Sequence, residues 1–348
     1  MVQDGRLIGR RGDDPAVTVT AEPLGEAPPA GRPPAPSIAG EPDALISLNA
    51  AFSQTVEVEV AAGARLGAPV VIVHHTGAAA AASFPRLVVR IGAQAEASVV
   101  EVATSADVDA LVVPVTELDV GDGAHAGYVH VQQLGDRVWQ TGLQTSRVGR
   151  DATFTSAAVA LGGDYARLRT ASSMVGAGGT ARLLAVYLGS DRRMIDFRTV
   201  QDHRAPNATS ELLFKGAVAN QSRGVYTGLI RVEKGARGTN AFQTNRNLVL
   251  HEGAEAWSVP NLEIEDNDVR CSHASAVGPI APDERFYLES RGVRPDTAER
   301  LITLGFLDEV VARLPVAGVA APVRRALAAT LDRADAAERA GDPAEETD

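Results

Sequence analysis

A step of two small residues recurs along the chain at a nearly constant interval. The steps are Gly63-Ala64, Gly92-Ala93, Gly123-Ala124, Asp151-Ala152, Thr180-Ala181, Asn207-Ala208, Gly235-Ala236 and Gly253-Ala254. The first seven alanines are 27 to 31 residues apart, and the eighth follows after 18. Gly, Asp and Asn accept tight or left-handed corners, and Ala fits where successive corners stack closely. The sequence therefore predicts a structure of stacked coils.

Short segments rich in Val, Leu and Ile lie between these steps. In TVEVEV, residues 55–60, three valines alternate with two glutamates and a threonine, which is the period-two pattern of a half-buried strand. Residues 46–280 contain no long stretch with the period of a helix, and a β-sandwich would leave the regular corners unexplained. Because stacking pairs the strands of each coil and forms one apolar column, we expect an all-β core folded as a parallel β-helix over residues 45–280.

The two ends of the chain differ from this repeat. Residues 1–44 carry eight prolines and few large apolar side chains, which predicts a flexible lead-in. Residues 281–348 predict a helical domain with three helices and an acidic tail, because Pro and Gly stand near the ends of the helical segments. The middle helix carries an apolar stripe that needs a partner, either in its own chain or in another protein. The stripe consists of Leu301, Leu304, Leu307, Val310, Val311 and Leu314.

Charge and cysteine content narrow the function classes. The formal net charge is −11 and the isoelectric point about 5.2, which argues against binding to nucleic acid or to an anionic membrane. One cysteine excludes an internal disulfide. We expect a cytoplasmic protein, since no export signal and no apolar run long enough to span a bilayer occurs. No P-loop motif is present, so we expect no bound nucleotide.

Several other motifs favour ordinary structural roles. His74 and His75 are adjacent, so on a strand they face opposite sides and do not easily share a ligand. The acidic run EIEDND, residues 263–268, lacks the glycine and distal glutamate of a calcium loop and predicts a solvated turn. Glu57 with Glu59, or Asp266 with Asp268, leaves open a polysaccharide-active enzyme, although such enzymes usually act outside the cell.

The most informative polar pair is Cys271 and His273. On a strand the two side chains project to the same side, which permits a shared ligand. The ordinary interpretation is a small buried thiol beside a hydrogen-bonded histidine. One cysteine and one histidine do not complete a four-ligand metal site, so a metal here requires ligands from elsewhere, for example from a second protein chain.

The second half of the chain resembles the SufB/SufD family of iron–sulfur cluster assembly proteins. The motifs that carry the resemblance are FKG at 214–216, QTNRNLVL at 243–250, PNLEIEDNDVRCSHASAVG at 260–278 and FYLESRGV at 286–293. A weaker likeness extends back to about residue 44. The chain looks most like the SufD subunit, because the SufB paralogue has a glutamate in the CSH segment and a separate sulfur-accepting cysteine.

The resemblance implies a right-handed parallel β-helix followed by a helical domain, and a non-catalytic scaffold. It implies pairing with a SufB-like subunit through the C-terminal part of the β-helix and binding of a SufC-like ATPase through the C-terminal helices. A homodimer of the isolated chain is a further expectation. The family's interface histidine matches His273 and a neighbouring cysteine matches Cys271, so both are expected at a transient iron–sulfur cluster shared with the SufB-like partner. A self-assembling structural β-helix stays open as an alternative.

Overall fold

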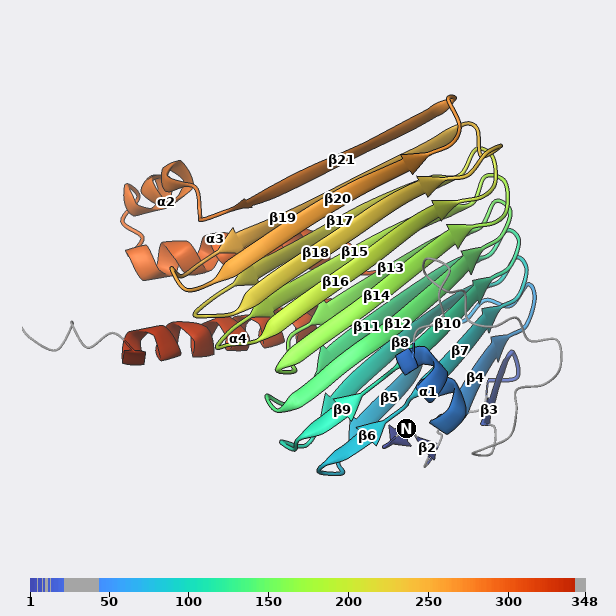
Figure 1. Cartoon of the computed structure of the whole chain (residues 1–348), viewed down its shortest axis with the longest axis horizontal. Helices are drawn as coiled ribbons and strands as arrows, with labels where there is room; N and C mark the ends of the chain where they lie inside the picture. The colour runs from blue at the N-terminus through green and yellow to red at the C-terminus, as the bar shows by residue number, and fades with distance from the viewer. Residues whose placement is uncertain (5, 8, 10–11, 13, 22–43, 342–348) are drawn as a thin grey trace, which may run out of the picture.

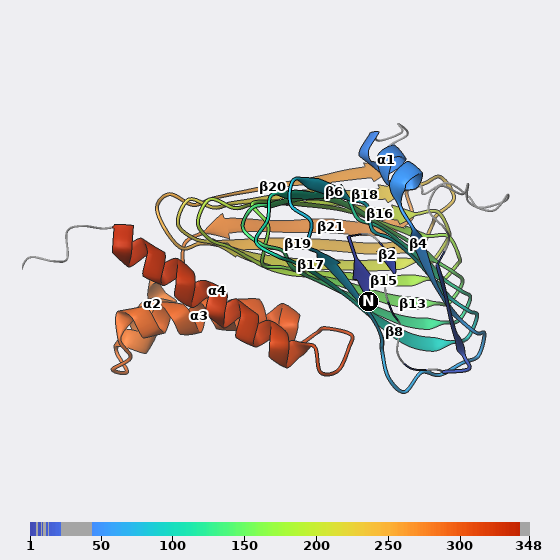
Figure 2. The same cartoon turned by 90° about the horizontal axis from the view of Figure 1, so that it is seen from below.

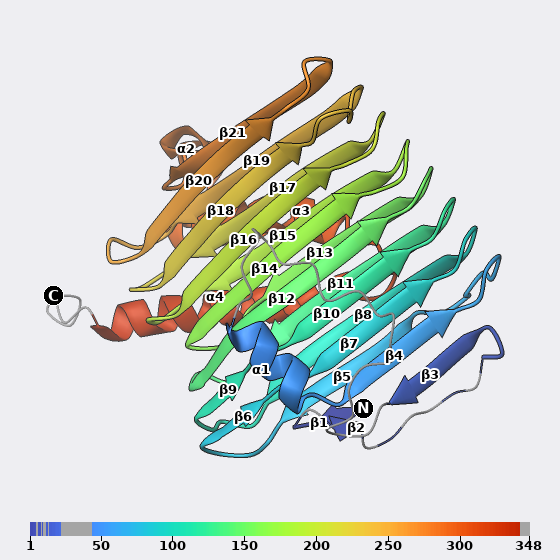
Figure 3. The ribbon, with the colours of Figure 1, turned by 45° about the vertical axis from the view of Figure 1, so that its right-hand side comes forward.

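A column of stacked β-strands forms most of the protein, with the C-terminal helices on one side (Figure 1). The structure is a computed structural model that describes residues 1–4, 6, 7, 9, 12, 14–21 and 44–341. The proline-rich run at 22–43 and the acidic tail lie outside the described residues. The column is a parallel β-solenoid of about eight turns, which confirms the predicted fold class. Figure 3 shows the strands stacked one above the other along its length.

Two sheets form opposite walls of the column. The first sheet has the order β2-β1-β5-β8-β11-β13-β15-β17-β19-β21. Its strands from β5 onward are β5 (Val70–Thr76), β8 (Glu96–Ser105), β11 (His125–Gln133), β13 (Thr153–Ala160), β15 (Thr180–Gly189), β17 (Thr209–Val218), β19 (Thr239–Val249) and β21 (Val269–Gly278). Thr153 lies beside Thr180 and Thr180 beside Thr209, so these turns are 27 and 29 residues long.

The second sheet has the order β20-β18-β16-β14-β12-β10-β7-β4-β3. Its strands from β4 onward are β4 (Thr55–Val60), β7 (Arg86–Ile91), β10 (Val115–Val120), β12 (Val138–Val148), β14 (Tyr165–Met174), β16 (Met194–His203), β18 (Arg223–Val232) and β20 (Glu255–Ile264). The short strands β6 (Ala81–Ser83) and β9 (Ala110–Val112) pair with each other, and β9 also pairs with β12. The chain therefore alternates between the two walls.

Three strands lie in the part of the chain where the sequence predicts a flexible lead-in. They are β1 (Val2–Gln3), β2 (Arg6–Leu7) and β3 (Val17–Ala21). β1 runs parallel to β5, and β3 runs antiparallel to β4. For these residues, pairing with a neighbouring strand supplies the hydrogen bonds that the isolated segment lacks.

The corners on one side of the column explain the repeat. Gly63, Gly123, Asp151 and Asn207 have φ between 53° and 70°, the left-handed conformation expected for them. Each donates its backbone N–H to a carbonyl in the corner of the next turn, for example Asp151 N to Ala177 O at 2.9 Å. The alanines that follow Gly123, Asp151 and Asn207 are at most 1 % exposed. The predicted corners are therefore the places where successive turns stack.

Three predicted steps have a different place in the structure. Thr180-Ala181 begins β15, and the left-handed residue of its corner is Gly178, with φ 72°. At Gly92-Ala93 the left-handed residue is Gln94, with φ 57°, and the fully buried alanine is Ala95. Gly253-Ala254 lies between β19 and β20, at the corner on the opposite side of the column. The change of side explains why its spacing is 18 residues instead of about 28.

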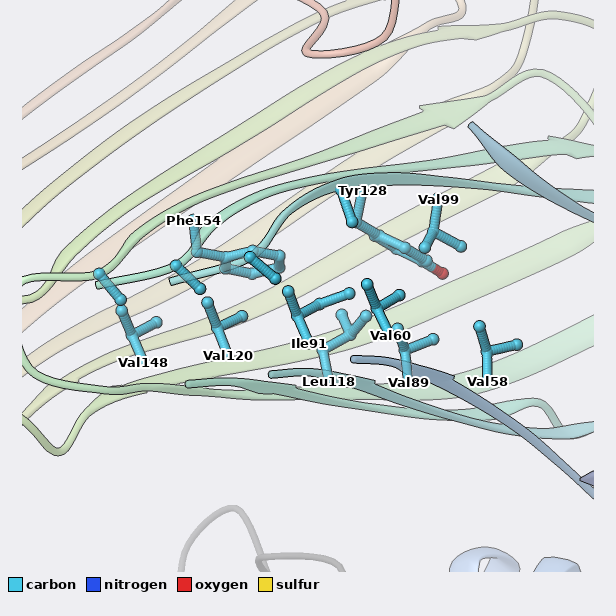
Figure 4. Packing of buried hydrophobic residues seen from close by; sticks show 14 of the residues in the cluster. Val58, Val60, Val89, Ile91, Val99, Leu118, Val120, Tyr128, Val148 and Phe154 are labelled. Atoms are coloured by element: carbon cyan, nitrogen blue, oxygen red, sulfur yellow. The ribbon is translucent and has the colours of Figure 1, made fainter. Parts of the chain in front are cut away.

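Aliphatic and aromatic side chains fill the interior between the two sheets (Figure 4). In β4, Val56, Val58 and Val60 point inward and are at most 2 % exposed, as the alternation predicts. Val89 and Ile91 of β7 stack directly on Val58 and Val60. Higher in the column a second cluster contains four aromatic rings with neighbouring centroids 5.3 to 5.5 Å apart, from Tyr187, Phe197, Phe214 and Tyr226.

The helices cover the outside of the walls. The predicted three C-terminal helices are α2 (Pro282–Glu289), α3 (Pro295–Val311) and α4 (Ala320–Gly341). Leu307, Val310 and Val311 of α3 are buried in one cluster with outward side chains of the first sheet, so most of the apolar stripe finds its partner in its own chain. Figure 2 shows the three helices on a single side of the column. A fourth helix, α1 (Ala44–Phe52), was not predicted.

Candidate functional site

The last turn of the column has a neighbour on one side only. β20 pairs with β18 and β21 pairs with β19, so within the part of the chain that the structure describes, each has an unpaired outer edge. Large apolar side chains are exposed on these two strands. They are Trp257, Val259, Leu262, Ile264 and Val277, with exposed fractions of 39 to 51 %. Unpaired edges with apolar side chains are templates for another chain.

Cys271 lies on the inner side of β21. It contacts the buried cluster of Ile230, Val232, Ala236 and Ala241 and is itself half-buried. Burial raises the pKa of the Cys271 thiol, and a hydrogen bond with the Ala241 backbone offsets this only in part. At neutral pH the thiol is therefore protonated, and it binds iron only after a base or the metal removes its proton.

His273 lies two residues further along β21 and is exposed. Because side chains alternate along a strand, its ring projects to the same side as Cys271. That side faces the interior, but no further turn covers it, so the ring is reachable from the open end. The register places His273 beside Gln243 of β19.

The layer beneath His273 contains polar groups. Gln243 is 1 % exposed, and neither its Oε1 nor its Nε2 has a hydrogen-bond partner among the described residues. The same holds for the hydroxyl of Ser258 on β20. The Gln243 side chain extends across the interior towards Gly228, where a Cβ would lie 2.5 Å from its Nε2. The glycine therefore provides the space that the amide occupies.

The other sequence candidates have structural contacts. His74 is buried inside the column, while His75 faces away from it and approaches the Thr104 hydroxyl at 3.1 Å, so the two histidines point apart as predicted. Glu57 lies 3.6 Å from Arg90, and Asp266 accepts the backbone N–H groups of Gly235 and Asp268. The contacts of Asp266 are those of the turn that the sequence predicts.

The described residues contain neither a clustered metal site nor a membrane-spanning helix. No group of three or more His, Cys, Asp or Glu side chains in this part of the chain is arranged to hold a metal ion. No helix in this part of the chain is long and apolar enough to cross a membrane.

Comparison with known proteins gives the family. A family model described as "SUF system FeS cluster assembly, SufBD core domain" matches residues 73–306, which extend from β5 into α3. This range is more than half of the chain. The chain belongs to the SufBD family. The match confirms the resemblance seen in the motifs at 214–293.

Relatives with curated names include both SufBD family proteins and SufD. The SufBD family protein of Mycobacterium tuberculosis is 35% identical over 231 residues, which cover 64% of this chain and 58% of the relative. SufD of Escherichia coli is 34% identical over 167 residues, 48% of this chain and 40% of the relative. SufD of Bacillus subtilis is 30% identical over 212 residues, which cover 61% of this chain and 48% of the relative. The chain thus spans about half the length of the SufBD relatives it matches.

The FKG motif of this SufBD protein has a structural role. Lys215 points outward from β17 beneath α3, and its side chain is 5 % exposed. Its Nζ lies 2.5 Å from Glu309 Oε2, donates to the carbonyl of Phe306 at 3.2 Å and lies 4.1 Å from the centre of the Phe306 ring. The hydrogen bond from Lys215 lowers the pKa of Glu309. Lys215 therefore attaches α3 to the column.

Sequence reasoning did not find a polar cluster inside the SufBD column. Glu101 is 2 % exposed, and its Oε1 lies 2.9 Å from His74 Nε2. Its Oε2 accepts hydrogen bonds from the Tyr128 and Thr116 hydroxyls. Burial by itself raises the pKa of Glu101, but the hydrogen bond and charge of His74, the charge of His130 and the Tyr128 hydroxyl together lower it to about 2. The sequence does contain one sign of this cluster. Glu101 stands at an inward position of β8, where apolar side chains would be expected.

Proposed function

We propose that this chain is a non-catalytic, SufD-like scaffold subunit that pairs with a SufB-like subunit through β20 and β21. A nascent iron–sulfur cluster, the cargo of the complex, binds at the interface, and His273 and the deprotonated Cys271 are its ligands from this chain. The observation that carries the proposal is an exposed imidazole on an edge strand at the open end of the column. Membership of the SufBD family supports it, because the matching family model is described as belonging to an iron–sulfur cluster assembly system.

The donor set fits a site shared between two chains. Imidazole is a suitable iron ligand, and Cys271 becomes one on deprotonation. Cys271 and His273 together supply two ligands, and the remaining ligands come from the SufB-like partner. Exposed Trp257, Val259 and Val277 supply apolar area for that partner, and the outer edges of β20 and β21 supply backbone groups. In the isolated chain the same surface supports a homodimer.

The C-terminal helices are the proposed docking site of a SufC-like ATPase. α2, α3 and the outer faces of β17 and β19 enclose an open groove of about 700 Å³. Tyr287 and Leu301 line the groove and are 59 % and 51 % exposed. In this scheme the ATPase partner hydrolyses ATP in the cytoplasm, and this subunit binds no nucleotide.

The histidine proposal is tested by cluster formation in the reconstituted complex of this chain with its SufB-like and SufC-like partners. His273→Ala removes the imidazole from an exposed position, so we expect a folded complex with roughly a tenfold or larger loss of cluster, measured by visible absorption and by iron and sulfide content. His125→Ala removes an exposed histidine from β11 and is the matched control. A His273→Ala complex with wild-type cluster yield would remove His273 from the site.

A further inference from the structure

The buried amide of Gln243 is the starting point. An unpaired amide in the interior destabilises the fold, so a buried side chain of this kind needs a specific reason. Both of its polar atoms are unpaired among the described residues, and the side chain extends across the interior towards Gly228 of β18, directly below the last turn of the column. No other inward amide of β19 is free in this way: Asn247 donates to Asn245 Oδ1 at 2.9 Å and accepts from the Tyr187 hydroxyl.

The register identifies the group that Gln243 can serve. Gln243 and His273 are direct neighbours on parallel strands, and such strands lie about 4.8 Å apart. Both side chains project to the inner side, so the amide lies in the layer directly below the imidazole. A histidine that binds a metal usually donates the N–H of its other ring nitrogen to an oxygen, which fixes the tautomer and the ring orientation. Gln243 Oε1 is an oxygen of this kind on the strand next to the ring.

We propose that Gln243 is the positioning residue of His273. Its Oε1 accepts the N–H of one ring nitrogen, and the other nitrogen is thereby directed to the open end of the column as the iron ligand. The inference rests on the proposed function of His273 and adds the residue that orients it. A partner subunit that covers β20 and β21 excludes water from this layer, which strengthens the hydrogen bond.

The test measures ferrous iron binding by the reconstituted complex. Gln243→Leu removes the acceptor at similar volume, and we expect iron affinity to fall by about 10- to 100-fold and the reduction potential of the assembled cluster to shift. Gln243→Glu keeps an oxygen at the same position, so we expect affinity within a few-fold of wild type. Gln140→Leu, which replaces a buried glutamine with an unpaired Oε1 on β12, is the control and should leave iron binding unchanged.

The outcomes separate this inference from the proposed function. If Gln243→Leu binds iron as tightly as wild type while His273→Ala does not, Gln243 has no positioning role and the function of His273 stands. If His273→Ala itself leaves iron binding unchanged, the proposed function of His273 is refuted, and the positioning role of Gln243 is refuted with it. Should Gln243→Leu not fold, as judged by circular dichroism, Gln243→Met replaces it. Equal iron affinity of the Met and Glu variants would then overturn the inference, since only Glu accepts the N–H.

Discussion

Ionisable side chains occur inside the column and at its open end, and burial gives them different roles. His273 is exposed and available to a partner, whereas Glu101, His74 and His130 are at most 7 % exposed and interact with one another. Burial lowers the pKa of His130, although the charge of Glu101 opposes this. Burial likewise lowers the pKa of His203, to about 4. The interior therefore stabilises one carboxylate through its neighbours, and burial disfavours the charged forms of His130 and His203.

At the residue scale we predict that Glu101 makes folding sensitive to acid. Its pKa in the folded protein, about 2, lies below its ordinary value of 4.5, so its contribution is complete above about pH 4.5 and is lost as the pH falls towards 2. Glu101→Gln should lower the free energy of unfolding at neutral pH by roughly 3 kcal/mol and remove this acid dependence. Urea denaturation at several pH values, followed by circular dichroism, measures both effects.

Glu96→Gln is the control for this prediction. Glu96 lies on the same strand, β8, but is exposed and 3.9 Å from an exposed Arg65. An exposed pair of this kind contributes little, so the substitution should leave the acid dependence as in wild type. If Glu101→Gln loses as much stability in acid as the wild type does, groups other than Glu101 cause the acid dependence.

At the scale of elements, α3 has two faces with different partners. Leu307, Val310 and Val311 are buried against the first sheet, and Lys215 holds the same helix through Glu309. Leu301 lies on the other part of the stripe and is exposed. Deletion of the helices would therefore expose apolar side chains of the first sheet. A single substitution at an exposed position of α3 tests binding of the ATPase without exposing them.

We predict that Leu301→Asp weakens binding of the SufC-like ATPase by about tenfold or more, because it places a charge in the apolar groove between α2 and α3. Titration of the ATPase by calorimetry or interferometry measures the affinity. Val71→Asp is the matched control, since Val71 is 56 % exposed and lies on β5, far from α3 along the column. Unchanged affinity of Leu301→Asp would place the ATPase on another surface.

At the scale of the whole molecule, the column has an open end where its last turn lacks a neighbour. The interior of earlier turns is closed by the turn that follows, but Leu262 and Ile264 of β20 point to the inner side and are still 39 % and 43 % exposed. The end of the column is thus an incomplete core, and a second chain that adds strands would complete it.

We predict that Val259→Lys on β20 prevents self-association of the isolated chain and weakens pairing with the SufB-like subunit. A lysine on an edge strand opposes pairing because its charge would be buried by the incoming chain. Sedimentation velocity over a range of concentrations measures the oligomeric state. Leu48→Lys on α1, an exposed leucine away from this end, is the control. A Val259→Lys chain that dimerises like wild type would place the contact elsewhere.

Local features of the sequence determined the β-solenoid, its corners and the three C-terminal helices, because a left-handed residue, a small alanine or a proline acts on its own stretch of backbone. The tertiary structure alone decided which side chains meet across turns. Glu101, His74 and His130 come from three strands, and Asn49 of α1 is buried through hydrogen bonds to the carbonyls of Pro85 and Val113. Such contacts depend on register between turns, and a corner displaced by two residues, as at Gln94, changes which side chains are neighbours.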